Sequence, residues 1–250
     1  MNLVFFLKAM ATNAVRALPW PSGTSFVELD PGPLGCTGED RLCSSAYTRL
    51  WQSFQDSNGE AMPGLIRRYG GGDPSPRVAF VGFSAAHGFL NPIATNDADR
   101  SKIDAFILMD ATFGGGKNGY AKFGAEAARG ERLLATTTSN TGGDDGWQMV
   151  WQNVLAQTGK SPSRVSARPP MPEPSGGTYR LGSSLYWLRF VNAQGGTELA
   201  HWNMGNVLSP MLEAYLIPYW KGQLSFPWMH AALGAAAVGA AYYAYDRYVG

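Results

Sequence analysis

Residues 78–90, VAFVGFSAAHGFL, are the most informative stretch of the sequence, because they join a short apolar run, a serine among small residues and the start of a helix-favouring segment. Residues 78–81 have the length and composition of a buried strand. Gly82 and Ala86 flank Ser84 closely. A strand, a sharp turn and a helix in this order hold a serine hydroxyl above the edge of a sheet. Ser84 is therefore a candidate nucleophile.

Further apolar runs alternate with helix-like segments along the chain. Most of these runs are apolar almost throughout, which is typical of parallel strands buried on both faces. We therefore predict an α/β fold, with a mostly parallel sheet of about six strands and helices on both faces. The other strands are predicted at residues 3–7, 25–29, 103–109, 132–138 and 179–191.

This alternation predicts one domain over residues 1–222. The segment 161–177 is rich in proline and small residues, but strand and helix patterns continue beyond it. We therefore interpret it as a surface excursion within the domain. The strand at 179–191 is expected to be interrupted near Gly182, where Gly-Ser-Ser occurs.

Charge and metal-binding side chains narrow the possible sites. The 20 Lys and Arg residues are balanced by 19 Asp and Glu residues, which leaves no electrostatic footprint for nucleic acid. The two cysteines and three histidines form no CxxC or HExxH spacing, so we expect no metal and no cofactor. Cys36 and Cys43 are close in sequence, and both a disulfide and two free thiols fit this spacing.

Polar residues follow the predicted strands in an order that fits nucleophilic catalysis. Ser84 follows one strand, Asp144 and Asp145 follow the strand at 132–138, and His201 follows the last strand. The loops after parallel strands emerge at the same edge of a sheet, so these side chains can meet there. A serine needs a base that removes its proton, and the base needs an acid that fixes its tautomer.

The scarcity of histidine favours His201 as the base. His87 lies one helical turn beyond Ser84, and we interpret it as a helix-packing or supporting residue. His230 lies within an apolar tail.

The segment 82–88, GFSAAHG, is similar to the nucleophile elbow of the α/β-hydrolase superfamily of esterases and lipases, with Ala86 where a glycine is more usual. Over residues 3–220 the strand pattern resembles the third to eighth strands of that family, so the sheet is a reduced one without the first two. The resemblance implies a serine hydrolase that cleaves an ester, thioester or amide through an acyl-enzyme. Its substrate would be a small-molecule or lipid-like acyl compound.

The resemblance also implies an oxyanion hole made of main-chain donors. The N–H of Ala85, directly after the serine, is the first donor. The second is the N–H of Lys8 or Ala9, which occupy the place where the family often has His-Gly.

Three carboxylates occupy positions that this family uses for the acid. Asp144 and Asp145 follow the counterpart of its seventh strand, and Asp110 ends the counterpart of its sixth. We predict Asp144 as the triad acid, with Asp145 and Asp110 as alternatives.

Residues 226–245, FPWMHAALGAAAVGAAYYAY, carry no formal charge over a length of about 20 residues, which is enough to span a bilayer. We predict an apolar helix within residues 223–250 that anchors the chain to a membrane or seats it in a larger assembly. The tail and the reduced sheet also support an alternative function. In that alternative, the chain is a non-catalytic structural or assembly protein with a hydrolase-like fold in a membrane or virus-like particle.

Overall fold

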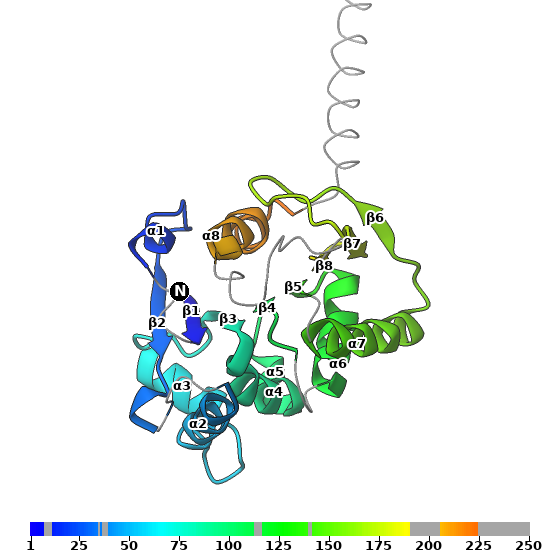
Figure 1. Ribbon diagram of the computed structural model, residues 1–250. Coiled ribbons are helices and arrows are strands. Elements are labelled where there is room, and N and C mark those ends of the chain that lie inside the picture. The colour runs from blue at the N-terminus through cyan, green and yellow to red at the C-terminus, as the bar shows by residue number, and fades with distance from the viewer. Residues whose placement is uncertain are drawn as a thin grey trace, which may run out of the picture.

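A computed structural model describes residues 1–7, 12–34, 36, 40–112, 117–139, 142–190 and 206–224 of the chain. Its centre is an eight-stranded sheet with the order β2-β1-β3-β4-β5-β8-β7-β6 (Figure 1). All neighbours from β2 to β8 in that order are parallel, which confirms the predicted α/β class. The strands are β1 (Asn2–Leu7), β2 (Thr24–Leu29), β3 (Arg77–Phe83), β4 (Ala105–Met109), β5 (Leu133–Thr138), β6 (Ser163–Val165), β7 (Thr178–Leu181) and β8 (Leu185–Arg189).

Helices cover both faces of this sheet, as predicted, and form a three-layer arrangement (Figure 1). One face is covered by α2, α3, α4, α6 and α7, and the other by α1 and the helical segment α8–η4–α9. The helices are α1 (Asn13–Arg16), α2 (Asp40–Gln52), α3 (Met62–Tyr69), α4 (His87–Thr95), α5 (Asp97–Ser101), α6 (Lys117–Arg129), α7 (Gly142–Thr158), α8 (Leu208–Met211), the π-helical turn η4 (Leu212–Leu216) and α9 (Ile217–Trp220).

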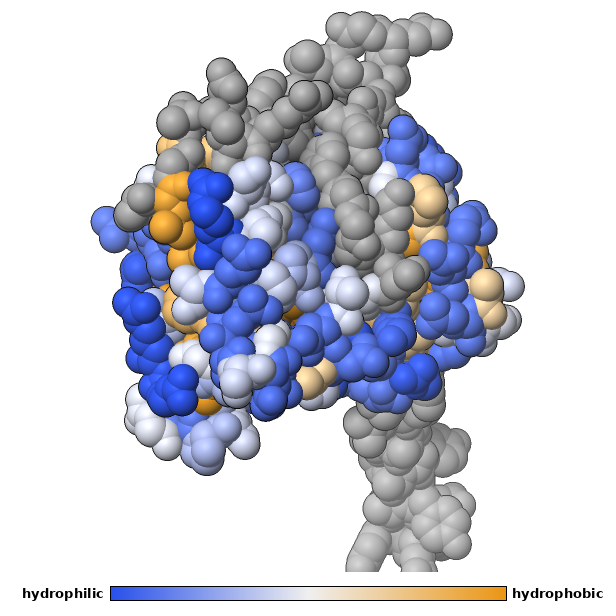
Figure 2. All heavy atoms as spheres, turned by 90° about the horizontal axis from the view of Figure 1, so that it is seen from below, coloured by the Kyte–Doolittle hydropathy of each residue, from blue (hydrophilic) through white to orange (hydrophobic). Residues whose placement is uncertain are grey.

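The core strands are buried on both sides because nearly all their side chains are apolar. Phe5, Phe80 and Phe106 occupy paired register positions on β1, β3 and β4. Their ring centroids are 5.0 and 6.0 Å apart, and they form an aromatic row under one helical layer. The outer surface on the side of that layer is mostly hydrophilic, with scattered hydrophobic side chains (Figure 2). Burial of the apolar faces of the helices therefore organises the core.

The sheet has two strands more than the expected six, because β6 was not predicted and the predicted strand at 179–191 forms two strands, β7 and β8. β6 and β7 extend the sheet in the antiparallel sense. The predicted interruption of the last strand is confirmed. Gly182 adopts a φ of +62° at a turn, and the chain there folds into the β7–β8 hairpin instead of one long strand. The proline-rich segment 161–177 contains β6, whose exposed Ser-Arg-Val sequence has no strand pattern.

The C-terminal apolar helix predicted within residues 223–250 lies outside the described residues, except for Gln223 and Leu224. Within the described ranges, no helix has the length and apolar character needed to cross a membrane. The last described helical segment runs from Leu208 to Trp220.

Candidate functional site

The serine turn has the predicted order of strand, turn and helix. Strand β3 ends at Phe83, the turn η2 (Ser84–Ala86) follows, and α4 begins at His87. Ser84 adopts a φ of +48° and is 4% exposed. A left-handed conformation is uncommon for a residue with a Cβ and costs about 1–2 kcal/mol. The tertiary structure therefore holds Ser84 in a conformation that its own sequence does not favour.

Small residues on either side of Ser84 allow α4 to pack against β3. A Cβ on Gly82 would overlap the side chain of Leu90 and lie 3.1 Å from the Cβ of Ala86. The methyl group of Ala86 is accommodated because Gly82 lacks a side chain. This contact explains why alanine is compatible with a position where glycine is more usual in such turns.

Asp110 lies beside the serine turn at the same edge of the sheet. Phe83 on β3 pairs with Met109 on β4, so Ser84 and Asp110 are the next residues of two neighbouring parallel strands. Asp110 is fully buried and adopts a φ of +50°. It accepts hydrogen bonds from the main-chain N–H and the Oγ of Ser139. Among the described residues, Ser84 and Asp110 are the two non-glycine residues with a positive φ.

Asp144, the predicted acid, lies in the first turn of α7 and its side chain is 7% exposed. Its carboxylate accepts hydrogen bonds from Arg189 Nη2 at 2.8 Å, Thr138 Oγ1 at 2.7 Å and Gln148 Nε2 at 2.9 Å. Burial acts to raise its pKa, but these hydrogen bonds outweigh burial and hold the pKa of Asp144 below its usual value. Asp145, the next residue, is exposed. The carboxylate of Asp144 thus joins α7 to the ends of β5 and β8.

The remaining predicted site residues are placed only in part. Ala85 directly follows Ser84 and is buried. Leu7, the last residue of β1, pairs with Gly82, so the chain leaves β1 beside the strand that carries the serine. Residues 8 and 9 and both His201 and His230 lie outside the described residues.

His87 lies in the described part of the chain, and its imidazole ring contacts the main chain of the serine turn. Its Nδ1 is 3.0 Å from the carbonyl oxygen of Ser84, and its Nε2 is 2.9 Å from Ser44 Oγ on α2. Cys43, next to Ser44, is bonded to Cys36, so the disulfide is the alternative that the structure contains. This disulfide ties the first turn of α2 to the loop before it.

A polar pocket of about 360 Å³ lies at the opposite edge, where β3, β4 and β5 begin. Its cationic side chains are engaged in ion pairs: Lys102 with Glu60 at 3.2 Å and Arg132 with Glu126 at 2.7 Å. Its polar lining comprises Ser75, Ser101, Lys102, Asp104, Glu131 and Arg132.

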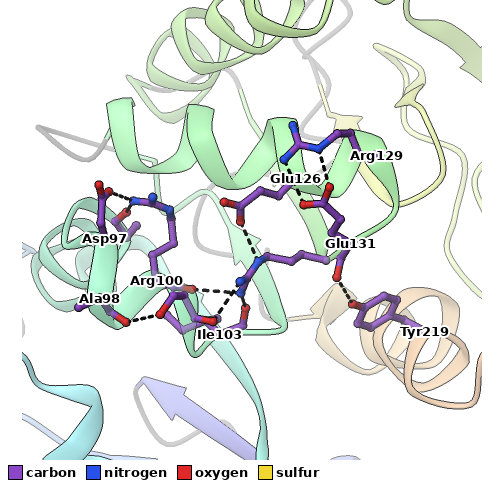
Figure 3. Close-up of polar contacts among 11 residues, drawn as sticks. Asp97, Ala98, Arg100, Ile103, Glu126, Arg129, Glu131 and Tyr219 are labelled. Atoms are coloured by element: carbon purple, nitrogen blue, oxygen red, sulfur yellow. Dashed lines mark hydrogen bonds and ion pairs between the residues drawn. The ribbon is translucent and has the colours of Figure 1, made fainter.

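Arg132 makes polar contacts with several segments at the amino-terminal edge. Figure 3 shows this edge, with the Arg132 partners Arg100, Ile103 and Glu126 labelled. The guanidinium of Arg132 donates to the main-chain oxygens of Arg100, Ser101 and Ile103. These contacts satisfy carbonyl groups at the end of α5 and in the turn before β4. We therefore assign this edge a structural role. Within the described ranges, no group of three or more potential metal-ligating side chains occurs.

The chain order of the strands places a topological switch point beside Ser84. The chain proceeds from β1 to β2 in one direction and from β3 onward in the other, so β1 and β3 flank the topological switch point. Ligands of open α/β sheets bind outside the carboxyl ends of the strands at such a point. Comparisons with models of protein families, with curated proteins and with solved structures find no match. Fold and site thus define an α/β protein with a strained serine at its switch point.

Proposed function

We propose that this chain is a serine hydrolase of the α/β-hydrolase type, with Ser84 as the nucleophile. The observation that carries the proposal is the left-handed, buried serine that directly follows the central parallel strand β3 and precedes a helix. Strain of this kind persists where the surrounding structure over-determines a residue, and it clusters at active sites. The bond cleaved would be an ester, thioester or amide in a small-molecule or lipid-like acyl substrate.

The reaction would proceed in two steps. Ser84 Oγ attacks the acyl carbon while His201 takes the hydroxyl proton, and the leaving group then departs with that proton. Water next gives a proton to His201 and attacks the acyl-enzyme, which releases the acid and restores the serine. The main-chain N–H groups of Ala85 and of Lys8 or Ala9 would stabilise the oxyanion in both steps.

The contacts of the carboxylates favour Asp110 over Asp144 as the acid that orients His201. Asp110 is buried next to Ser84 in the register of the sheet. Asp144 forms an ion pair with Arg189 and accepts hydrogen bonds from Thr138 and Gln148. Its carboxylate oxygens are therefore engaged in contacts that hold α7 against β5 and β8. We therefore propose Asp110 as the orienting acid and keep Asp144 and the exposed Asp145 as competing candidates.

Beside the apolar tail, the burial of Ser84 favours the alternative function. A side chain that is 4% exposed offers little surface to a substrate. In that alternative the chain is a non-catalytic assembly protein, and residues 226–245 seat it in a membrane or a larger particle. The left-handed φ of Ser84 argues for catalysis, because a purely structural turn would be relieved by glycine at this position.

Hydrolysis of p-nitrophenyl esters with acyl chains of increasing length tests the proposal on the full chain. We expect wild type to release p-nitrophenolate above the uncatalysed rate, and Ser84→Ala to fall to that background. Ser101→Ala is the matched control, because Ser101 lies at the opposite edge and its hydroxyl donates to the carbonyl oxygen of Ala98 within α5. Equal rates for wild type and Ser84→Ala would overturn the proposal.

A further inference from the structure

The His87 ring bridges the serine turn and helix α2. Nδ1 lies 3.0 Å from the carbonyl oxygen of Ser84, and Nε2 lies 2.9 Å from Ser44 Oγ. A carbonyl oxygen carries no proton, so Nδ1 must donate in this contact. In the neutral ring Nε2 then accepts a proton from the hydroxyl of Ser44. In the charged ring Nε2 donates to the same oxygen, so the bond from Nδ1 to Ser84 is kept in both forms.

Helix α2, which carries Ser44, packs closely against α4, which carries His87. Thr48 Oγ1 on α2 donates to the carbonyl oxygen of Gly88 at 3.1 Å. A Cβ on Gly88 would overlap the carbonyl of Ser44, so α2 and α4 touch through their main chains at this point. This contact fixes the main chain of Ser44 beside α4, within reach of the ring of His87.

We propose that His87 is a positioning residue: through its Nδ1–H it holds the main chain of Ser84 in the left-handed conformation, and Ser44 orients the ring. This inference rests on the proposed function in that Ser84 is the nucleophile. It assigns the proton transfer to a group other than His87, whose Nδ1 is directed at the main chain of Ser84 and not at its hydroxyl.

Two substitutions distinguish the contributions of the two ring nitrogens of His87. In His87→Asn the side-chain amide lies near the position of Nδ1 and can still donate to the carbonyl of Ser84. In His87→Gln the amide lies near the position of Nε2, and the donor to Ser84 is lost. We would measure the rate at which a fluorophosphonate probe labels Ser84 in the full chain between pH 5 and pH 9. Thermal unfolding of each variant checks that it is folded.

We expect His87→Asn to be labelled within about fivefold of wild type and with the same pH profile, because the donor is retained. His87→Gln should be labelled about 10–100-fold more slowly, the range that corresponds to one lost hydrogen bond in a constrained site. Ser44→Ala should lie between them. Equal labelling of both His87 variants, whether fast or slow, would overturn the inference, and so would loss of the pH dependence in His87→Asn.

A second readout keeps this inference separate from the proposed function. If wild type is not labelled, the proposed function fails, but the support of the turn by His87 is still measurable. Hydrogen exchange of the amides in residues 84–87 should be faster in His87→Gln than in His87→Asn or wild type. Equal exchange in all three proteins would overturn the inference on its own.

Discussion

The two edges of the sheet use polar side chains in different ways. At the amino-terminal edge, Arg132 donates to three main-chain oxygens and pairs with Glu126. One charged side chain therefore binds the carbonyl groups at the end of α5 and before β4. At the carboxyl-terminal edge, Ser84 and Asp110 are buried in left-handed conformations. The first arrangement satisfies polar groups, which stability requires. The second stores strain, which stability alone does not require, and the difference locates the candidate site.

The largest expected effect tests the carboxyl-terminal edge. Asp110→Asn should lower the rate of ester hydrolysis about 10³–10⁴-fold, because an amide no longer fixes the tautomer of the base or stabilises its charge. The midpoint of urea unfolding should change little. Steady-state kinetics of Asp110→Asn beside Asp144→Asn identify the acid: a large loss in Asp144→Asn alone would reassign the role to Asp144.

The next effect tests the amino-terminal edge. Arg132→Met should lower the free energy of unfolding by about 3 kcal/mol, because it leaves Glu126 without its cation and removes the guanidinium hydrogen bonds to three carbonyl oxygens, of which that of Arg100 keeps the N–H of Ile103. The hydrolysis rate of the folded variant should equal that of wild type. Arg132→Lys, which keeps the charge but not the planar fork, should lose less stability. A lower hydrolysis rate without a lower free energy of unfolding would contradict the structural role assigned to the amino-terminal edge.

The fold could be predicted from the sequence where one local signal determined it. Apolar runs such as residues 103–109 indicated buried parallel strands, because strands covered on both faces need apolar side chains throughout. The antiparallel strand β6 was missed as an element, whereas β7 overlaps the predicted strand at 179–191. Ser163–Val165 is short and mostly exposed, so it has no hydrophobic pattern, and its pairing with β7 depends on the tertiary structure.

The candidate site was predictable to the extent that it is local. The small residues around Ser84 indicated the turn, because its geometry is set within a few positions. The surroundings of the carboxylates were not predictable, because they depend on partners distant in sequence. Asp144 meets Arg189 across 45 positions, and Asp110 meets Ser139 across 29. His201, Lys8 and Ala9 remain predictions, because they lie outside the described residues.

A smaller effect concerns the pH dependence at the carboxyl-terminal edge. The folded-state pKa of Asp144 is below its unfolded value, so its contribution to stability is present above the unfolded pKa and is lost as the pH falls through the folded pKa. Asp144→Asn should therefore be less stable than wild type at pH 7 by about 1–2 kcal/mol, and the gap should begin to narrow below about pH 4. Urea unfolding at pH 7, 5 and 3 measures this gap. A constant gap would contradict the assigned ion pair with Arg189.

The smallest effect has the opposite sign and belongs to the amino-terminal edge. Burial raises the pKa of Asp104, although the N–H of Val78 donates to its carboxylate at 2.6 Å. Its contribution to stability is thus full below the unfolded pKa and is lost as the pH rises through the folded pKa. From pH 4 to pH 7 the stability of Asp104→Asn should rise relative to wild type. The same unfolding series measures it, and a fall would contradict the predicted sign.

The most direct test of the central claim is to map the adduct of a fluorophosphonate probe on the full chain by mass spectrometry. We expect one phosphonyl group on the peptide that contains Ser84 in wild type and in Ser101→Ala, and none on Ser84→Ala. An adduct on a serine at the amino-terminal edge, or equal labelling of wild type and Ser84→Ala, would contradict it.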